Sequence, residues 1–196
     1  MTFDRLRYRK SRKMRIITGK YKGRHFEIPR SFKARPTTDF AKENIFNVLT
    51  QYIDFEEATA LDLFSGTGSI SLELMSRGCL QVVSVEMDRD HHRFICECIK
   101  KLGDKSCIPL RADVFKFLKA CHQQYDFIFA DPPYALKEIP QIPDLVFEKG
   151  LLKEDGMFVL EHGKDHDFSQ HPHFIEHRSY GSVNFSLFRA EATADA

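Results

Sequence analysis

The sequence predicts an α/β fold, in which helices cover both faces of a mostly parallel seven-stranded sheet and a small β-hairpin comes first. Three observations support this prediction. From residue 58 onward, short apolar segments alternate with segments of helical spacing. One apolar segment, YDFIFA at 125–130, is almost continuously hydrophobic, as expected of a strand buried on both faces. The alternation itself implies parallel strands joined by crossover helices.

The first 35 residues combine a predicted hairpin with a high positive charge. In MRIITGKYKGRHFEIP, residues 14–29, polar and apolar residues alternate with a period near two, and Gly19 and Gly23 supply turn residues. Residues 1–35 carry thirteen Lys or Arg against two acids, although the whole chain has a net charge of +1. A basic arm on an acidic body indicates a polyanionic partner, with a solvated tail as the alternative. The residues expected to contact a nucleic acid are Lys20, Lys22, Arg24 and Arg35.

A linker and a helix follow the hairpin. Pro36 favours an extended backbone at Arg35, and Thr37 or Thr38 can cap the next helix. This helix is predicted within residues 37–52, where four residues have the spacing of one helical face. They are Ile45, Val48, Leu49 and Tyr52.

The rest of the chain alternates strands and helices. The predicted strands are 58–64, 81–87, 106–110, 125–130, 156–162 and two more within 173–190, joined near Gly181. The predicted helices between them are 69–78, 90–103, 113–122 and 143–152. Gly78 and Gly103 are suited to end the first two of these helices. In the helix 90–103, the inward residues are Ile95, Cys98, Ile99 and Leu102.

Composition excludes several classes of protein. Hydrophobic residues make up 42% of the chain and charged residues 29%, which is ordinary globular usage. No apolar run approaches the roughly 18 residues of a membrane span, and the basic N-terminus lacks the apolar stretch of a secretory signal. The five cysteines show no Cys-x-x-Cys spacing, although Cys96 and Cys98 leave a metal site as the alternative. We expect a cytoplasmic protein with reduced thiols, no membrane partner and no structural metal.

The segment LDLFSGTGSISLEL, residues 61–74, predicts a ligand loop between a strand and a helix. The strand ends at Phe64, and Gly66 and Gly68 let the backbone turn sharply and approach a ligand near the helix N-terminus. A dinucleotide fingerprint would need a third glycine where Ser71 stands. With Asp62 before the glycines, the loop instead resembles the first motif of class I S-adenosylmethionine-dependent methyltransferases, whose fold is Rossmann-like.

Two further acids follow predicted strands and suit the same cofactor. Glu86 ends the second strand, where a carboxylate can accept hydrogen bonds from both ribose hydroxyls. Asp113 follows the third strand and can bond the adenine amine. The structural alternatives are a loop cap for Asp62, a surface acid for Glu86 and a helix N-cap for Asp113. The full set expected at the cofactor is Arg35, Thr37, Asp62, Phe64, Gly66, Gly68, Glu86, Met87, Asp113 and Val114.

The segment DPPY, residues 131–134, directly follows the buried strand. Proline cannot donate to a sheet, so Pro132 and Pro133 end the strand in a rigid turn. The segment resembles the Asp/Asn-Pro-Pro-Tyr/Phe motif of methyltransferases that modify exocyclic amines. Asp131 and the Pro132 carbonyl can accept the two N–H groups of the amine, and Tyr134 can stack on a flipped base. We expect Asp131, Pro132, Pro133 and Tyr134 to be catalytic, with a rigid turn and an exposed tyrosine as the alternative.

Residues 14–190 as a whole resemble the bacterial small-subunit ribosomal RNA guanine-N2 methyltransferases. The segments that carry the resemblance are MRIITGKYKGRHFEIP, RPTTDFAKENIFNVL, DLFSGTGSISLELMSRG, VEMD, DPPY, GMFVLEH and YGSVNFSLF. It implies S-adenosyl-L-methionine as cofactor and a guanine of 16S rRNA, in a partly assembled subunit, as substrate. We expect a monomer with four parts: a basic extension (1–13), the hairpin and linker (14–35), the methyltransferase domain (36–190) and a tail (191–196).

The chain departs from this family at three places, and other functions remain as alternatives. Phe40 stands where the family usually has Arg, and Cys98 replaces a usual Asn. Residues 1–13 precede the family start, so Met14 is an alternative initiator. An adenine-N6 methyltransferase is the main alternative function, because DPPY serves that amine equally well. A non-enzymatic nucleic-acid-binding protein would keep the basic arm but would not need Glu86 and DPPY together. A nicotinamide dehydrogenase is disfavoured by Ser71.

Overall fold

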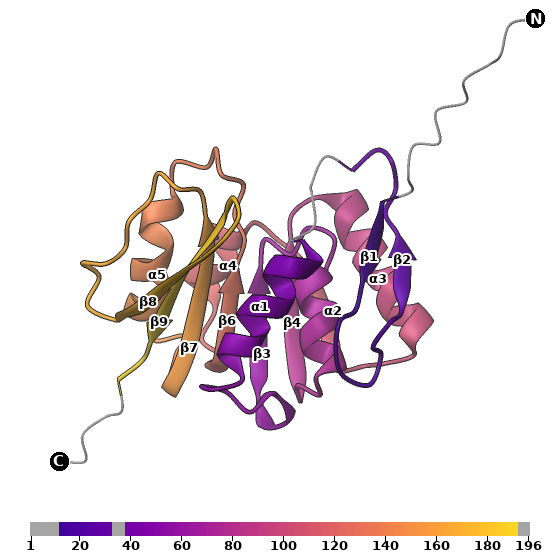
Figure 1. Ribbon diagram of the computed structural model, residues 1–196, viewed down its shortest axis with the longest axis horizontal. Helices are drawn as coiled ribbons and strands as arrows, with labels where there is room; N and C mark the ends of the chain where they lie inside the picture. The colour runs from indigo at the N-terminus through magenta and orange to yellow at the C-terminus, as the bar shows by residue number, and fades with distance from the viewer. Residues whose placement is uncertain (1–11, 33–37, 192–196) are drawn as a thin grey trace, which may run out of the picture.

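A twisted seven-stranded sheet forms the centre of the molecule (Figure 1). The computed structural model describes residues 12–32 and 38–191. The strand order is β5-β4-β3-β6-β7-β9-β8, in which β3 to β7 are parallel and β9 runs antiparallel between β7 and β8. This confirms the predicted sheet. The strands are β3 (Thr59–Leu63), β4 (Gln81–Glu86), β5 (Cys107–Arg111), β6 (Tyr125–Ala130), β7 (Leu152–His162), β8 (Phe174–Tyr180) and β9 (Val183–Arg189).

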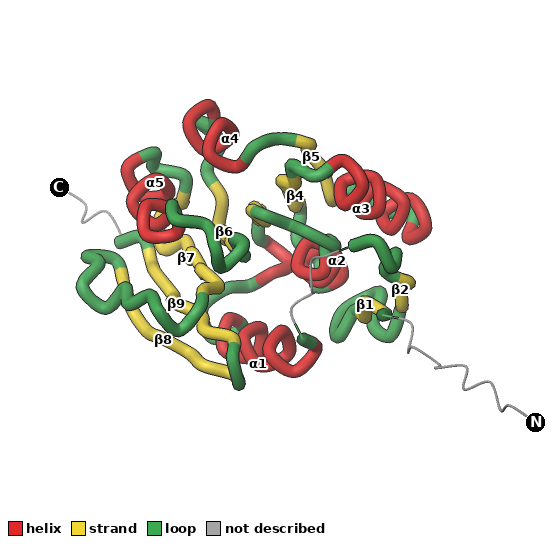
Figure 2. Tube along the Cα trace, turned by 90° about the horizontal axis from the view of Figure 1, so that it is seen from above, coloured by secondary structure: helices red, strands yellow, loops and turns green. Residues whose placement is uncertain are grey.

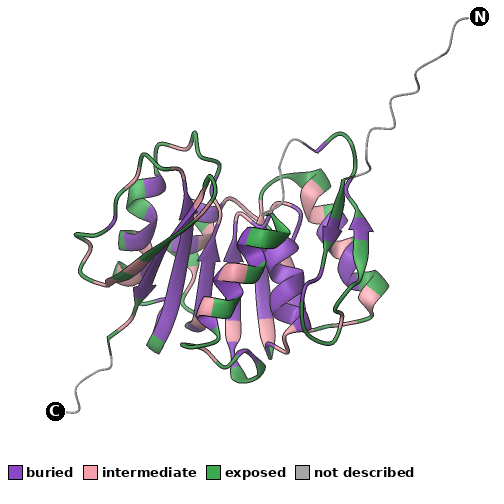
Figure 3. Ribbon diagram, viewed as in Figure 1, coloured by how far each residue is buried: buried purple, intermediate pink, exposed green. Residues whose placement is uncertain are grey.

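Helices cover both faces of this sheet (Figure 2). The helices are α1 (Asp39–Leu49), α2 (Ser69–Ser76), α3 (Arg89–Leu102), α4 (Val114–Ala120) and α5 (Ile142–Glu148). One apolar core joins the sheet to α1, α2 and α3, and a second core on the opposite face joins it to α4 and α5. The central strands are therefore buried along most of their length, whereas α1 and the hairpin present exposed outer surfaces (Figure 3). Within the described residues, no helix is long and apolar enough to cross a membrane.

The predicted inward face of the first helix was partly wrong. Thr38 caps α1 as expected, accepting a hydrogen bond from the Ala41 N–H at 3.2 Å. However, α1 ends at Leu49, so Tyr52 lies beyond the helix and is 36% exposed. Val48 is only partly buried, and Phe46 lies in the core in its place. The predicted helix is present, but it is shorter than predicted, and its buried face includes Phe46 and not Val48.

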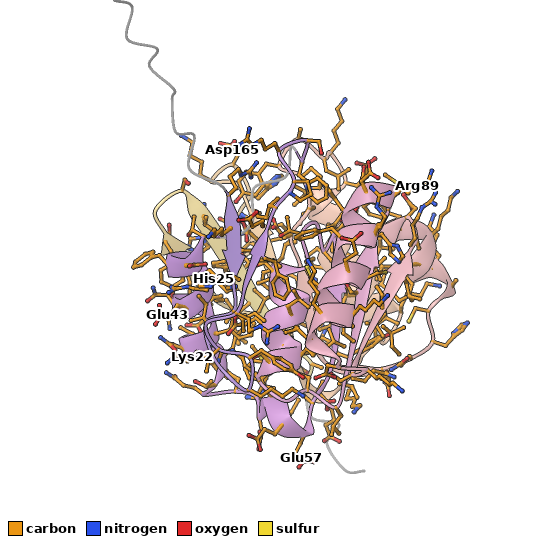
Figure 4. The ribbon with its side chains drawn as sticks, turned by 90° about the vertical axis from the view of Figure 1, so that its right-hand side faces the viewer. Lys22, His25, Glu43, Glu57, Arg89 and Asp165 are labelled. Carbon is orange, nitrogen blue, oxygen red and sulfur yellow. The ribbon has the colours of Figure 1, made fainter. Side chains whose placement is uncertain are left out.

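The N-terminal hairpin consists of β1 (Lys13–Arg15) and β2 (His25–Glu27), which pair antiparallel as predicted. It packs against the side of α2. Its turn lies at the C-terminal end of that helix, where the Lys20 N–H donates to the Ser76 carbonyl at 2.8 Å. Gly19 is required here, because it has a φ of +85° and a Cβ would lie 1.9 Å from the Ser76 oxygen. Figure 4 shows Lys22 of this turn at the lower left and Arg89, at the start of α3, at the upper right of the molecule.

A fully buried carboxylate, Glu73 of α2, fastens the hairpin to the body. It accepts hydrogen bonds from the Ile17 N–H at 2.8 Å and the Thr18 N–H at 3.0 Å. The Arg77 guanidinium donates to it at 3.1 Å, and the buried Lys42 ammonium of α1 lies 3.5 Å away. Because both cations and two hairpin amides converge on one carboxylate, the hairpin, α1 and α2 share a single polar anchor.

Removal of this anchor should destabilise the fold strongly. We expect Glu73→Ala to lower the free energy of unfolding by about 3–5 kcal/mol, because it leaves the buried Lys42 ammonium without its counter-charge and two backbone N–H groups without their acceptor. The measurement is urea unfolding followed by circular dichroism. Glu57→Ala, at an exposed position, is the control and should change stability by about 0.5 kcal/mol or less. Equal stability of the two variants would contradict the anchoring role.

Candidate functional site

A cavity of about 820 Å³ opens at the carboxyl edge of the sheet. Its walls come from the ends of β3, β4, β6 and β7, from the loops that follow the parallel strands, and from the β8–β9 turn. In an open α/β sheet this edge is where ligands bind. Of the residues predicted to form the site, the structure places Asp62, Phe64, Gly66, Glu86, Met87, Asp113, Val114, Asp131, Pro132, Pro133 and Tyr134 on the cavity wall.

The glycine loop after β3 owes its shape to three residues with left-handed backbone. They are Phe64 (φ 59°), Gly66 (φ 53°) and Gly68 (φ 77°). Gly68 is the N-cap of α2, and a Cβ there would lie 2.9 Å from the Ile95 side chain. Gly68 therefore contributes conformation and close packing and does not itself line the cavity. Phe64, a non-glycine residue in this region, is a position of backbone strain at the cavity wall.

Asp62 lies at the end of β3, beneath the glycine loop, and is 1% exposed. Its carboxylate accepts hydrogen bonds from the Ser71 N–H at 3.0 Å and from the Ser71 hydroxyl. The capping alternative for Asp62 is thus present in the structure, and the same side chain also lines the cavity. Burial raises the pKa of Asp62 to about 7, against the opposing hydrogen bonds from Ser71.

Glu86, at the end of β4, faces the glycine loop. One carboxylate oxygen accepts from the Gly66 N–H at 2.7 Å and the other from the Asp88 N–H at 2.7 Å. Asp113 accepts from the Lys116 N–H at 2.9 Å and so is the predicted N-cap of α4. Both acids also line the cavity, which means that their structural and ligand-binding interpretations are compatible.

The DPPY segment begins where β6 leaves the sheet. Asp131 lies against the neighbouring strand, with its N–H 3.3 Å from the Leu63 carbonyl. Burial raises the pKa of Asp131 well above its ordinary value, and the nearby negative charges of Glu161 and Asp62 add to the effect. Tyr134 is 47% exposed, and its hydroxyl donates to Glu161 at 3.0 Å. An exposed aromatic ring beside a buried acid suits a site for a flat polar ligand.

Sequence reasoning missed Glu161, the buried acid at the end of β7. A signal was available, because Glu161 follows an apolar strand in the same way that Asp131 does. Other cavity residues that were not predicted for the site include Thr38, His91, Phe115 and Val183. The Phe115 ring lies 6.2 Å from the Phe64 ring, edge to face, and both residues line the cavity.

The predicted RNA contacts lie elsewhere in the molecule. Lys20, Lys22 and Arg24 belong to the hairpin turn and do not line the cavity. The Lys20 ammonium forms an ion pair with Asp104 at 2.7 Å, so its positive charge is partly neutralised within the protein. Arg35 and Thr37 lie outside the described residues. Across 12–32 and 38–191, no group of three or more His, Cys, Asp or Glu side chains is arranged to hold a metal ion.

Comparison with known proteins identifies similar sequences. Residues 14–189 match the family described as conserved hypothetical protein 95. The Ribosomal RNA small subunit methyltransferase D of Escherichia coli K12 is 28% identical over 189 residues, covering 95% of this chain and 94% of that protein. The protein of the same name from Buchnera aphidicola (subsp. Baizongia pistaciae) is 30% identical over 148 residues, covering 76% of this chain and 75% of that one.

Solved structures give the same result for the fold. A hypothetical protein of Thermus thermophilus superposes with a TM-score of 0.79 at 28% identity, covering 90% of this chain and 99% of that one. The 16S rRNA N2 G1207 methyltransferase (RsmC) of T. thermophilus, solved with AdoMet and guanosine, superposes with a TM-score of 0.67 at 18% identity. The match covers 92% of this chain and 50% of that protein. Because the identity is only 18%, the match supports a shared fold and no shared function. The fold is that of class I methyltransferases.

The raised pKa of Asp62 predicts a pH-dependent contribution to stability. The folded protein keeps a proton on Asp62 up to about pH 7, whereas the unfolded chain releases it near the ordinary value of 3.8. Stability is therefore lost as the pH rises through this window, by about 2–3 kcal/mol between pH 5 and 7. In Asp62→Asn this loss should be absent. Urea unfolding of both proteins at pH 5, 6, 7 and 8 measures the difference, and parallel pH profiles would contradict the assignment.

Proposed function

The chain belongs to the family described as conserved hypothetical protein 95, and on this premise we propose that it methylates small-subunit ribosomal RNA at the exocyclic N2 amine of a guanine, with S-adenosyl-L-methionine as methyl donor. Its relatives named Ribosomal RNA small subunit methyltransferase D support the substrate class. The observation that carries the proposal is that one cavity contains both the glycine loop and the acid of DPPY. A volume of about 820 Å³ lies within the roughly 300–1,000 Å³ of small-molecule pockets.

The residues of the glycine loop and the β4 end fit this cofactor. A carboxylate offers about four acceptor sites, so Glu86 can keep its bonds to the Gly66 and Asp88 amides and still accept ribose hydroxyls. Phe64, Met87 and Val114 supply apolar surface for the adenine, and Asp113 adds an acceptor near it. S-adenosyl-L-methionine carries no phosphate group, so an acidic cavity wall does not repel it.

Catalysis in this scheme depends on positioning. When bound, S-adenosyl-L-methionine supplies a methyl group that is already electrophilic. The Asp131 carboxylate and the Pro132 carbonyl accept hydrogen bonds from the two N–H groups of the amine. These bonds localise the lone pair of the amine nitrogen and direct it at the methyl group. The ionised form of Asp131 is the better acceptor. Since the pKa of Asp131 is raised, first by burial and then by Glu161, the transfer rate should increase with pH through its titration.

The basic hairpin is the proposed contact for the RNA backbone, and a partly assembled subunit is the proposed form of the substrate. Lys22 and Arg24 are exposed on the turn. The turn lies at the far end of α2 from the glycine loop, roughly 12 Å away along eight residues at 1.5 Å each. The RNA would therefore follow the side of α2 between the hairpin turn and the cavity. We propose that the enzyme acts as a monomer.

Two variants test the assignment of the cavity. Asp131→Ala should bind S-adenosyl-L-methionine almost normally but lose methyl transfer, because it removes an acceptor used by the reacting amine. Glu86→Ala should instead weaken cofactor binding by about 1–3 kcal/mol through loss of charge-assisted hydrogen bonds. Calorimetry with the cofactor and transfer of labelled methyl to 16S rRNA measure both effects. Full turnover by Asp131→Ala, or unchanged affinity in Glu86→Ala, would refute the corresponding role.

The hairpin is tested by the salt dependence of RNA binding. Each single-strand phosphate contact contributes about 0.7 to the slope of log affinity against log salt. Replacing Lys22 and Arg24 by alanine should flatten the slope by about 1.4, and replacing Lys20 as well should bring the change to roughly two units if all three reach phosphates. Cofactor affinity should not change. Lys119→Ala, exposed on α4, is the control. Equal slopes would show that the hairpin cations face solvent and do not contact RNA phosphates.

A further inference from the structure

Three carboxyl groups lie on the same face of the sheet, at the ends of three neighbouring strands. Asp62 pairs in register with Phe129, two positions before Asp131. Ala130 pairs with Leu160, so Asp131 and Glu161 are the next residues of two adjacent parallel strands. Paired residues of neighbouring strands project to the same face. All three acids line the cavity, and Glu161 is 5% exposed.

The side-by-side arrangement of Asp131 and Glu161 is electrostatically unfavourable. Their mutual repulsion contributes to the raised pKa of Asp131. Glu161 is buried and Asp131 is half-buried, so the repulsion is stronger than it would be in water. Such clusters are typical of functional sites. Asp131 has a role in the proposed reaction, whereas that reaction, as described so far, gives no role to a second acid beside it.

We propose that Glu161 determines which base is methylated, by accepting the N1–H of guanine while Asp131 accepts the N2 amine. The inference rests on the proposed function and extends it to base selection. On guanine, the N1–H and the N2 amine are adjacent donors, and two adjacent acidic acceptors match them. On adenine, the amine lies beside N1, which is itself an acceptor and would be repelled by the Glu161 carboxylate. Enzymes that flip bases read this same edge.

Tyr134 gives Glu161 a second way to act, which the experiment has to separate from the first. The Tyr134 hydroxyl donates to Glu161 at 3.0 Å, so Glu161 also holds the ring in place. If that were its whole role, loss of the hydroxyl in Tyr134→Phe would have the same effect as Glu161→Gln. Direct reading of the base predicts a different result, because Tyr134→Phe keeps both the ring and the carboxylate.

The experiment compares two bases at one RNA position. The wild-type enzyme first methylates 16S rRNA, and the modified nucleotide is located by mass spectrometry. Synthetic RNAs covering that site then carry either guanine or 2-aminopurine, which keeps the N2 amine but has an acceptor at N1. We expect the wild type to favour guanine by at least about 100-fold in kcat/KM, since a hydrogen-bonding site rejects a base that leaves its groups unpaired. Glu161→Gln should reduce this ratio about tenfold or more, because its amide can donate to the N1 of 2-aminopurine.

Controls make each outcome decisive. Glu154→Gln, exposed at the opposite end of the same strand, should keep the wild-type ratio, and Tyr134→Phe should keep it while lowering both rates. Equal methylation of the two bases by the wild type would overturn the inference without any variant. An unchanged ratio in a folded Glu161→Gln protein would overturn it as well. Absence of N2-methylguanine in the wild-type product would instead refute the proposed function.

Discussion

The buried Glu73 carboxylate is the interaction on which the arrangement of the N-terminal half depends. It binds two amides of the hairpin and the Arg77 guanidinium, and it lies beside the Lys42 ammonium. Lys42 in turn donates to the Arg15 carbonyl at 2.6 Å and to the Ser69 hydroxyl, at the start of α2, at 3.0 Å. A buried polar network is costly unless its members are satisfied, and here each donor has an acceptor. The hairpin and the glycine loop are therefore held by one network that includes both ends of α2.

A second constraint comes from the parallel sheet. Because parallel strands all end at one edge, acids that follow different strands are brought together without any sequence proximity. Four acids meet in this way: Asp62, Glu86, Asp131 and Glu161. Burial raises the pKa of the Asp62 carboxyl and of the Asp131 carboxyl. The cluster reduces stability at neutral pH. This loss is consistent with a site selected for binding hydrogen-bond donors, such as ribose hydroxyls and base amines.

The sequence predicted the elements that depend on local patterns and missed those that depend on tertiary contacts. The mostly parallel sheet, the strand-end turn at DPPY and the glycine loop followed from periodicity, proline chemistry and motif spacing. The buried face of α1 did not, because Phe46 is selected by its contacts with Phe55 and the Arg77 guanidinium, which come from other elements. Glu161 was missed because a single acid at the end of an apolar strand has no motif of its own. Its meaning appears only when the register places it beside Asp131.

The separation of charges in the molecule also limits how a nucleic acid can approach. The cavity wall carries several carboxylates, whereas exposed Lys and Arg side chains lie on the hairpin turn, at the other end of α2. Phosphates are repelled by the first surface and attracted by the second. On the proposed function, the backbone would then stay outside the cavity and only an uncharged base would enter it, next to the Tyr134 ring. Phosphate contacts would thus set the position of the RNA, and the acids at the strand ends would select the base, which assigns affinity and specificity to different parts of the fold.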